Sequence, residues 1–174
     1  MARIIGIINA KGGVGKTTTA NNLGAYLAAM GKYVLLVDLD PQANATAGLG
    51  LHLADDHLNL YHLLINGNEP GAIIRKSSLF GLDILPSAEN LAGATVELVG
   101  MEEREFKLKK ALDKIRTNYD YILIDSPPSL GLLTVNGLAA AEEVIIPVQC
   151  EYYALEGLGQ IGRASCRERV SSPV

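Results

Sequence analysis

The chain has 174 residues, of which 48% are hydrophobic, and a formal net charge of -4. This length allows one domain with a sizeable core and excludes two domains of ordinary size. No apolar stretch approaches the roughly 18 to 20 residues of a membrane-spanning helix, and the first residues do not resemble a secretory leader. Its two cysteines, Cys150 and Cys166, have no metal-binding or disulfide spacing, so we expect a protein of the reducing cytoplasm without a membrane span.

The first forty residues predict a strand, a helix and a second strand. Residues 3–9 are a short run rich in β-branched side chains, which is typical of a strand buried on both faces. Apolar side chains recur at helical spacing over 17–30, and Gly31 stands where a helix C-cap is expected. The apolar run 33–37 is the second strand. A right-handed crossover of this length joins parallel strands.

The rest of the chain continues the alternation of strands and helices. We predict a loop over 39–51, a short helix over 58–65, a strand over 81–86, a helix over 102–117, a strand over 121–124, a helix over 132–141 and a strand over 144–148. This order predicts an α/β domain with a mostly parallel sheet flanked by helices.

The last thirteen residues differ in composition from what precedes them. Residues 162–174 contain three arginines and one glutamate and have neither helical nor strand periodicity. We interpret them as a non-native or disordered tail, with residues 1–161 forming the domain. A solvated native tail is the alternative interpretation.

A Gly-rich segment, NAKGGVGKTT over 9–18, lies between the first strand and the first helix. A loop in this position turns backbone N–H groups and a helix N-terminus toward phosphate, so we interpret it as a P-loop that binds ATP with magnesium. Lys16 offers a charge to the β- and γ-phosphates, and the Thr17 hydroxyl can bind magnesium. A glycine turn that only caps the helix would not require the Lys-Thr pair. The predicted nucleotide-binding residues are Lys11, Gly12, Gly13, Val14, Gly15, Lys16, Thr17 and Thr18.

Three acidic residues follow predicted strands and should lie at the same edge of the sheet as the P-loop. Asp38 and Asp40 follow the second strand, and Asp125 ends the strand over 121–124. One carboxylate after the second strand can orient or deprotonate water while the other steadies magnesium. Asp125 has the place of a Walker B acid, which holds magnesium through water. The alternative for Asp38 or Asp40 is that it only caps a turn.

Two other groups of residues are assigned no site. His52, His57 and His62 share no helical face and have no cysteine beside them, so we predict no metal site there. Tyr152 and Tyr153 have no basic or aromatic neighbours, which favours packing at the start of a helix over base stacking.

The P-loop departs from the general pattern by carrying Ala10 in place of glycine and a second lysine, Lys11. In this the chain resembles the deviant-Walker ATPases of the ParA, MinD and nitrogenase-iron-protein superfamily, whose signature is KGGVGKTT. Segments 34–46, 119–129 and 146–157 narrow the resemblance to the ParA/Soj partitioning ATPases. It runs to about Ile161, so the chain corresponds to the N-terminal part of such a P-loop domain, with the last strands missing.

The resemblance implies roles for individual residues. It implies that Lys11 reaches the nucleotide of a facing subunit, that Asp40 activates the attacking water and that Asp38 is a magnesium or switch residue. The predicted catalytic residues are therefore Lys11, Lys16 and Asp40, and the predicted magnesium residues are Thr17, Asp38 and Asp125. Pro127 and Pro128 belong to a turn that acts as a nucleotide-sensing switch in the family.

The resemblance also implies partners and a cellular role. It predicts a homodimer that sandwiches ATP, binds DNA without sequence preference through a C-terminal region absent here, and responds to a ParB-type centromere-binding protein. The role would be chromosome or plasmid segregation in the cytoplasm, at the nucleoid. A MinD-like division-site ATPase is an alternative, although no basic amphipathic helix ends the sequence. A truncated, inactive nucleotide-binding fragment is another.

Overall fold

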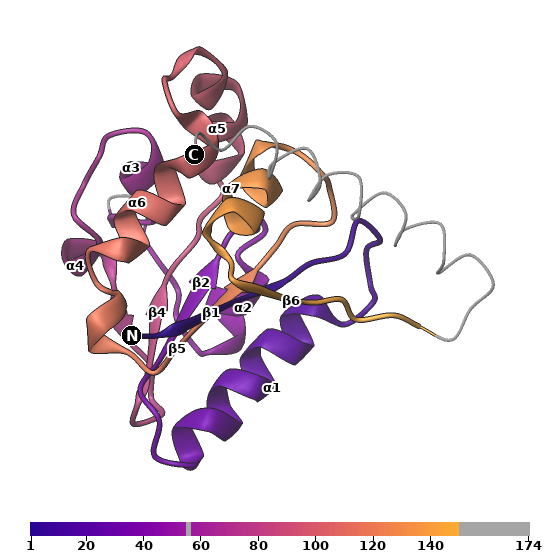
Figure 1. Ribbon diagram of the computed structural model, residues 1–174, viewed down its shortest axis with the longest axis vertical. Coiled ribbons are helices and arrows are strands. Elements are labelled where there is room, and N and C mark those ends of the chain that lie inside the picture. The colour runs from indigo at the N-terminus through magenta and orange to yellow at the C-terminus, as the bar shows by residue number, and fades with distance from the viewer. Residues whose placement is uncertain (55–56, 150–174) are drawn as a thin grey trace.

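Six strands form one sheet in the part of the chain that the structure describes, residues 1–54 and 57–149 of a computed structural model (Figure 1). The strands are β1 (Arg3–Ile7), β2 (Val34–Asp38), β3 (Arg75–Lys76), β4 (Leu82–Leu85), β5 (Tyr121–Asp125) and β6 (Glu143–Ile145). Their order in the sheet is β3-β4-β2-β5-β1-β6, and all pairs are parallel except β3 with β4. The predicted mostly parallel α/β fold is confirmed.

Helices cover both faces of the sheet. The α-helices are α1 (Lys16–Ala29), α2 (Asn44–Gly48), α3 (Leu60–Leu64), α4 (Pro70–Ile73), α5 (Leu91–Glu97), α6 (Lys107–Asp113) and α7 (Leu132–Ala140), and the 3-10 helices are η1 (Leu98–Gly100), η2 (Arg104–Phe106) and η3 (Arg116–Asn118). Residues of α1 and α2 pack on one face, and residues of α3 to α7 pack on the other (Figure 1).

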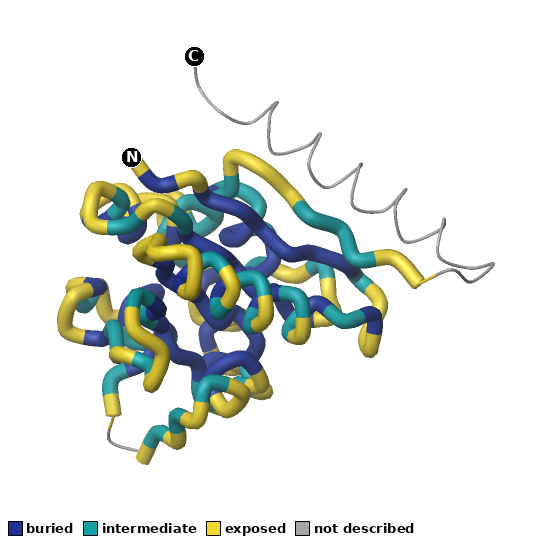
Figure 2. Tube along the Cα trace, turned by 90° about the horizontal axis from the view of Figure 1, so that it is seen from below, coloured by how far each residue is buried: buried dark blue, intermediate teal, exposed yellow. Residues whose placement is uncertain are grey.

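The central strand β2 shows why these residues make a three-layer structure. All five of its residues are buried, and successive side chains point to opposite faces of the sheet. Leu35 and Val37 therefore join the core beneath α3 to α7, whereas Val34 and Leu36 join the core beneath α1. Figure 2 shows this buried centre enclosed by exposed helices and loops.

Most of the predicted elements are found, with two corrections. The predicted loop over 39–51 contains α2, a helix whose glycine and asparagine have weak helix propensity and whose residue Thr46 is held by a tertiary contact described below. The predicted helix over 102–117 is divided into η2, α6 and η3, with Glu103 in the left-handed conformation at a φ of 50°. The short elements α4, β3 and α5 were not predicted.

Some predicted features lie outside the described residues. These are Cys150, Cys166, the pair Tyr152 and Tyr153, the end of segment 146–157 and the tail over 162–174. Within the described ranges, no helix has the length and apolar character needed to cross a membrane.

Candidate functional site

The carboxyl ends of β1, β2 and β5 meet at one edge of the sheet, and the Gly-rich loop joins β1 to α1 there. Gly13 and Gly15 have φ angles of 73° and 90°, in the left-handed region that disfavours other residues. Gly15 is the N-cap of α1, and no side chain caps this end of the helix. The free N–H groups of the first turn are therefore available to an anion, as the P-loop interpretation requires.

Asn9 fixes the start of the loop. Its Oδ1 accepts the N–H of Lys11 at 3.0 Å, and its Nδ2 donates to the carbonyl of Pro147 at 2.8 Å. On the other side of the loop, Gln149 donates from Nε2 to the carbonyl of Gly13 at 3.2 Å. The segment that follows β6 is thus bonded to the phosphate loop at two points.

Lys16 is buried, with 6% of its surface exposed, and its Nζ donates to the carbonyl of Lys11 at 3.0 Å. Burial lowers the pKa of this ammonium, and the nearby charges of Asp125 and Asp40 act in the opposite direction. The Lys11 side chain belongs to an exposed residue on the same loop. The two lysines therefore differ: Lys16 faces the inside of the loop, and Lys11 lies at the surface.

Thr17 and Asp125 form the most direct contact between the P-loop helix and β5. The Thr17 hydroxyl donates to Oδ2 of Asp125 at 2.7 Å, while Oδ1 of Asp125 is buried and has no hydrogen-bond partner. Burial raises the pKa of Asp125 to about 7, the charges of Asp38 and Asp40 add to this effect, and the bond from Thr17 opposes it. An unpartnered carboxylate oxygen beside a hydroxyl fits a hard cation such as magnesium.

No cluster of three or more His, Cys, Asp or Glu suited to a metal ion exists within residues 1–54 and 57–149. His57 and His62 have structural roles, because each accepts a backbone N–H at Nδ1, from Ala54 and Asn59 respectively.

Asp38 lies beside Asp125 in the register of β2 and β5 and is completely buried. Its Oδ1 accepts the N–H of Asp40 at 3.1 Å, and its Oδ2 accepts both the N–H and the hydroxyl of Thr46, at 2.8 and 2.7 Å. Burial raises the pKa of Asp38 to about 6 against the effect of these bonds. Both oxygens face protein donors, so Asp38 caps the turn and also holds α2.

Asp40 lies two residues after Asp38 and lines the groove beside the P-loop. Its Oδ1 accepts the N–H of Gln42 at 3.0 Å, which fixes the carboxylate, and the residue is 8% exposed. The groove has a volume of about 470 Å³. It is lined by Gly12, Gly13, Gly15, Lys16, Thr17, Thr18, Asp40, Gln42, Asn44 and Pro128. The structure thus places Asp40, Lys16 and Thr17 around one cavity.

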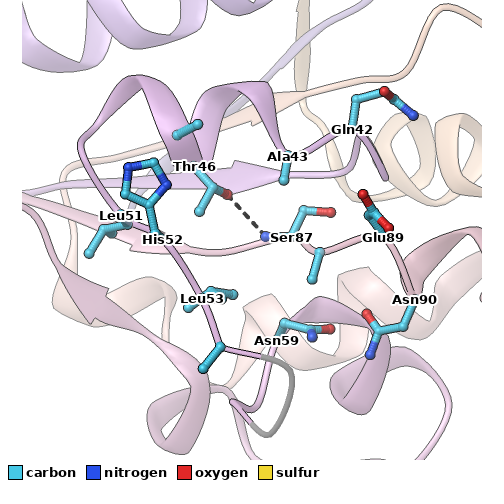
Figure 3. A pocket seen from close by; sticks show the side chains of 13 residues that line it. Gln42, Ala43, Thr46, Leu51, His52, Leu53, Asn59, Ser87, Glu89 and Asn90 are labelled. Atoms are coloured by element: carbon cyan, nitrogen blue, oxygen red, sulfur yellow. Dashed lines mark hydrogen bonds between the residues drawn. The ribbon is translucent and has the colours of Figure 1, made fainter.

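A second cavity, of about 590 Å³, lies behind the loop that follows β2 (Figure 3). Thr46 of α2 and Ser87, which follows β4, lie on its wall, and the Ser87 N–H donates to the Thr46 hydroxyl at 3.1 Å. Gln42 lines both cavities. Sequence reasoning missed Thr46 and Ser87, because no local motif indicates that they meet across 41 positions of the chain.

The AAA domain family model matches residues 2–167. The sporulation initiation inhibitor protein Soj of Bacillus subtilis (strain 168) is 56% identical over 161 residues, which cover 92% of this chain and 64% of that protein. The chromosome partitioning protein ParA of Myxococcus xanthus (strain DK1622) is 52% identical over 161 residues, covering 92% of this chain and 57% of that protein. The chain therefore spans less than two thirds of the length of either relative.

A similar solved structure is that of cobyrinic acid a,c-diamide synthase from Mycobacterium smegmatis with bound ADP and magnesium. It is 42% identical, has a TM-score of 0.93 and covers 98% of this chain and 69% of its own. A second structure of the same protein holds an ATP analogue and magnesium. The fold is thus shared with a protein crystallised with these ligands.

Proposed function

This chain belongs to the Soj/ParA family of partitioning ATPases, and from that premise we propose that it binds ATP with magnesium and hydrolyses it. One observation carries the proposal: Thr17 bonds Asp125, whose other oxygen is unpartnered, beside buried Lys16 in a groove formed by the phosphate loop. A hydroxyl, a carboxylate and an ammonium in this arrangement match the needs of a magnesium-bound triphosphate.

Each residue is proposed to do a separate part of the chemistry. The N–H groups of residues 12–18 bind phosphate oxygens, and Lys16 exchanges the Lys11 carbonyl for the β- and γ-phosphates. Thr17 and Asp125 hold magnesium, which neutralises charge on the phosphates. Asp40, fixed by Gln42, orients the attacking water and accepts its proton.

We further propose that ATP joins two copies of the chain, with Lys11 reaching the nucleotide of the partner. Its exposure at the surface of the loop supports this role. The ATP-bound dimer would bind DNA without sequence preference and serve in chromosome or plasmid segregation with a ParB-type protein. The identities with Soj and ParA support partitioning, since they exceed the identity with the synthase. Residues 1–161 are proposed to be the N-terminal part of the ATPase domain, and DNA binding is assigned to no residue of this chain.

Phosphate release from ATP by the purified chain, with and without Lys16→Ala, tests the enzymatic part. Turnover should depend on magnesium and fall at least about a hundredfold in the variant, because the charge on the transferred phosphate loses its partner. Lys76→Ala is the matched control, since its side chain is 90% exposed and lies at the far end of the sheet. Absence of turnover would favour an inactive nucleotide-binding fragment, and turnover unchanged by Lys16→Ala would contradict hydrolysis at the proposed site.

A further inference from the structure

Three elements are connected through the side chain of one threonine. Thr46 lies in α2, is 2% exposed, and makes hydrogen bonds in two directions. Its hydroxyl donates to Asp38 at the end of β2, and the same oxygen accepts the N–H of Ser87 in the turn that follows β4 (Figure 3). The oxygen thus bridges the end of β2 to the turn after β4.

The direction of these bonds determines what the hydroxyl can do. A hydroxyl has one proton, and a carboxylate can only accept it. Because the Ser87 N–H occupies a lone pair of Oγ1, the proton is directed to Asp38. Thr46 therefore holds one particular rotamer of Asp38 and cannot exchange donor and acceptor roles within this chain of bonds.

Asp38 transmits this constraint to Asp40. The Oδ2 of Asp38 is held by Thr46, and its Oδ1 accepts the backbone N–H of Asp40. The Asp40 carboxylate is fixed in turn by the N–H of Gln42. The series of bonds runs from Ser87 through Thr46 and Asp38 to the backbone of the acid that lines the P-loop groove.

We propose that the Thr46 hydroxyl is a positioning group for Asp40, which holds the loop after β2 so that the Asp40 carboxylate faces the P-loop groove. The catalytic part of this inference rests on the proposed ATPase function. Thr46 itself lies behind the loop, on the wall of the second cavity, and it does not line the groove. Its effect on hydrolysis would be indirect, through Asp38.

Amide hydrogen exchange at Asp40 and Gln42, measured by NMR on the nucleotide-free chain, tests the positioning directly. Thr46→Val removes the hydroxyl at nearly constant shape and should speed exchange at both amides by about fivefold or more. Thr46→Ser keeps the hydroxyl and should stay within about twofold of the wild type. If Thr46→Val does not fold, Thr46→Ala removes the same hydroxyl with a residue that favours helices.

The control Asn136→Ala distinguishes the proposed positioning role of Thr46 from a general contribution to stability. Asn136 is also buried, and it accepts the Leu108 N–H and donates to the carbonyls of Arg104 and Leu132, none of which belongs to the series of bonds from Ser87 to Asp40. This control should lower the melting temperature without selective exchange at Asp40. If Thr46→Val likewise leaves exchange at Asp40 within about twofold of the wild type, the positioning role is overturned, whatever the turnover.

Steady-state ATP turnover gives the second readout. Misplacement of a water-activating acid by a fraction of an ångström should lower kcat by about 10- to 100-fold in Thr46→Val and leave the KM for ATP within about threefold, with Thr46→Ser close to the wild type. An unchanged kcat in Thr46→Val also contradicts the inference. A wild type that does not hydrolyse ATP refutes the proposed function instead, and amide exchange still decides the role of Thr46.

Discussion

The backbone N–H of Asp40 donates to the carboxylate of Asp38 at 3.1 Å, so the acid that ends β2 holds the backbone of the acid two residues later. Asp38 is buried and satisfied by protein donors, whereas Asp40 reaches the groove beside the P-loop. Asp38 therefore shapes the loop, and Asp40 is the acid that we propose acts on a bound nucleotide.

Asp40→Asn should lower kcat for ATP hydrolysis by about 10²- to 10⁴-fold, because the amide cannot accept a proton from water. The substitution keeps an oxygen for the Gln42 N–H, so the loop and the affinity for a fluorescent ATP analogue should be preserved. Asp113→Asn, on an exposed part of α6, is the matched control. Turnover of Asp40→Asn within tenfold of the wild type would exclude Asp40 as the water-activating group.

Lys11→Ala should abolish nucleotide-dependent dimerisation while leaving nucleotide binding to one subunit within about threefold. We expect dimerisation and nucleotide binding to respond differently because Lys16 faces the inside of the loop, whereas Lys11 lies on its exposed surface. Analytical ultracentrifugation with and without a non-hydrolysable ATP analogue measures the effect. Lys32→Ala, another exposed lysine, serves as the control, and a dimer that survives Lys11→Ala counts against the cross-subunit role.

The metal-free, nucleotide-free protein should lose stability as the pH rises from 5 to 8. Burial raises the pKa of Asp125 to about 7 and that of Asp38 to about 6, so the folded state binds more protons than the unfolded state. The contribution of these two groups to stability is then fully present below pH about 4 and is lost as the pH rises through their folded-state pKa values. At ~1.4 kcal/mol per pKa unit, the loss is on the order of a few kcal/mol.

Urea denaturation in the presence of a chelator at pH 5 and pH 8 measures this loss. Asp125→Asn should flatten the dependence, because an amide carries no charge to bury. Carboxyl groups whose pKa is lowered by a basic partner, such as Glu143 beside Arg3, stay ionised over this range and do not add to it. Equal denaturation midpoints at both pH values would contradict a raised pKa of the buried carboxyl groups of Asp125 and Asp38.

Gly15→Ala should destabilise the protein by about 1 to 2 kcal/mol and weaken nucleotide binding at least about tenfold. Gly15 has a φ of 90°, where a Cβ atom is strained, and relief of this strain would turn the loop N–H groups away from phosphate. Gly71→Ala in α4 is the control, because no heavy atom lies within 4 Å of the added Cβ and φ is not positive. Thermal melting and titration with the ATP analogue report the two effects.

The sequence predicted those parts of the fold and site that depend on local pattern. β1, α1, β2 and β5 carry strong apolar periodicity or continuous β-branched runs, and the structure has them within a few residues of the predicted bounds. The grouping of Lys16, Thr17, Asp40 and Asp125 follows from parallel topology, because the carboxyl ends of neighbouring strands share one edge.

Features that depend on contacts distant in sequence were not predicted. The helix α2 exists although its residues favour a turn, since Asp38 accepts two hydrogen bonds from Thr46. The bond from Ser87 to Thr46 joins two loops whose separation in space is fixed only when β2 and β4 pair. The division of the helix over 102–117 depends on a left-handed residue, Glu103, which no glycine signals.

The bond from the Lys16 ammonium to the Lys11 carbonyl has a consequence for ligand affinity. The Lys11 carbonyl of the phosphate loop would compete with a phosphate oxygen for the Lys16 ammonium. In the proposed complex, phosphate would replace the Lys11 carbonyl as the partner of the Lys16 ammonium, so the measured affinity would be the difference between these two interactions. The same bond holds the two ends of the loop, Lys11 and Lys16, against each other, so one side chain would serve both the curvature of the loop and the proposed binding of phosphate.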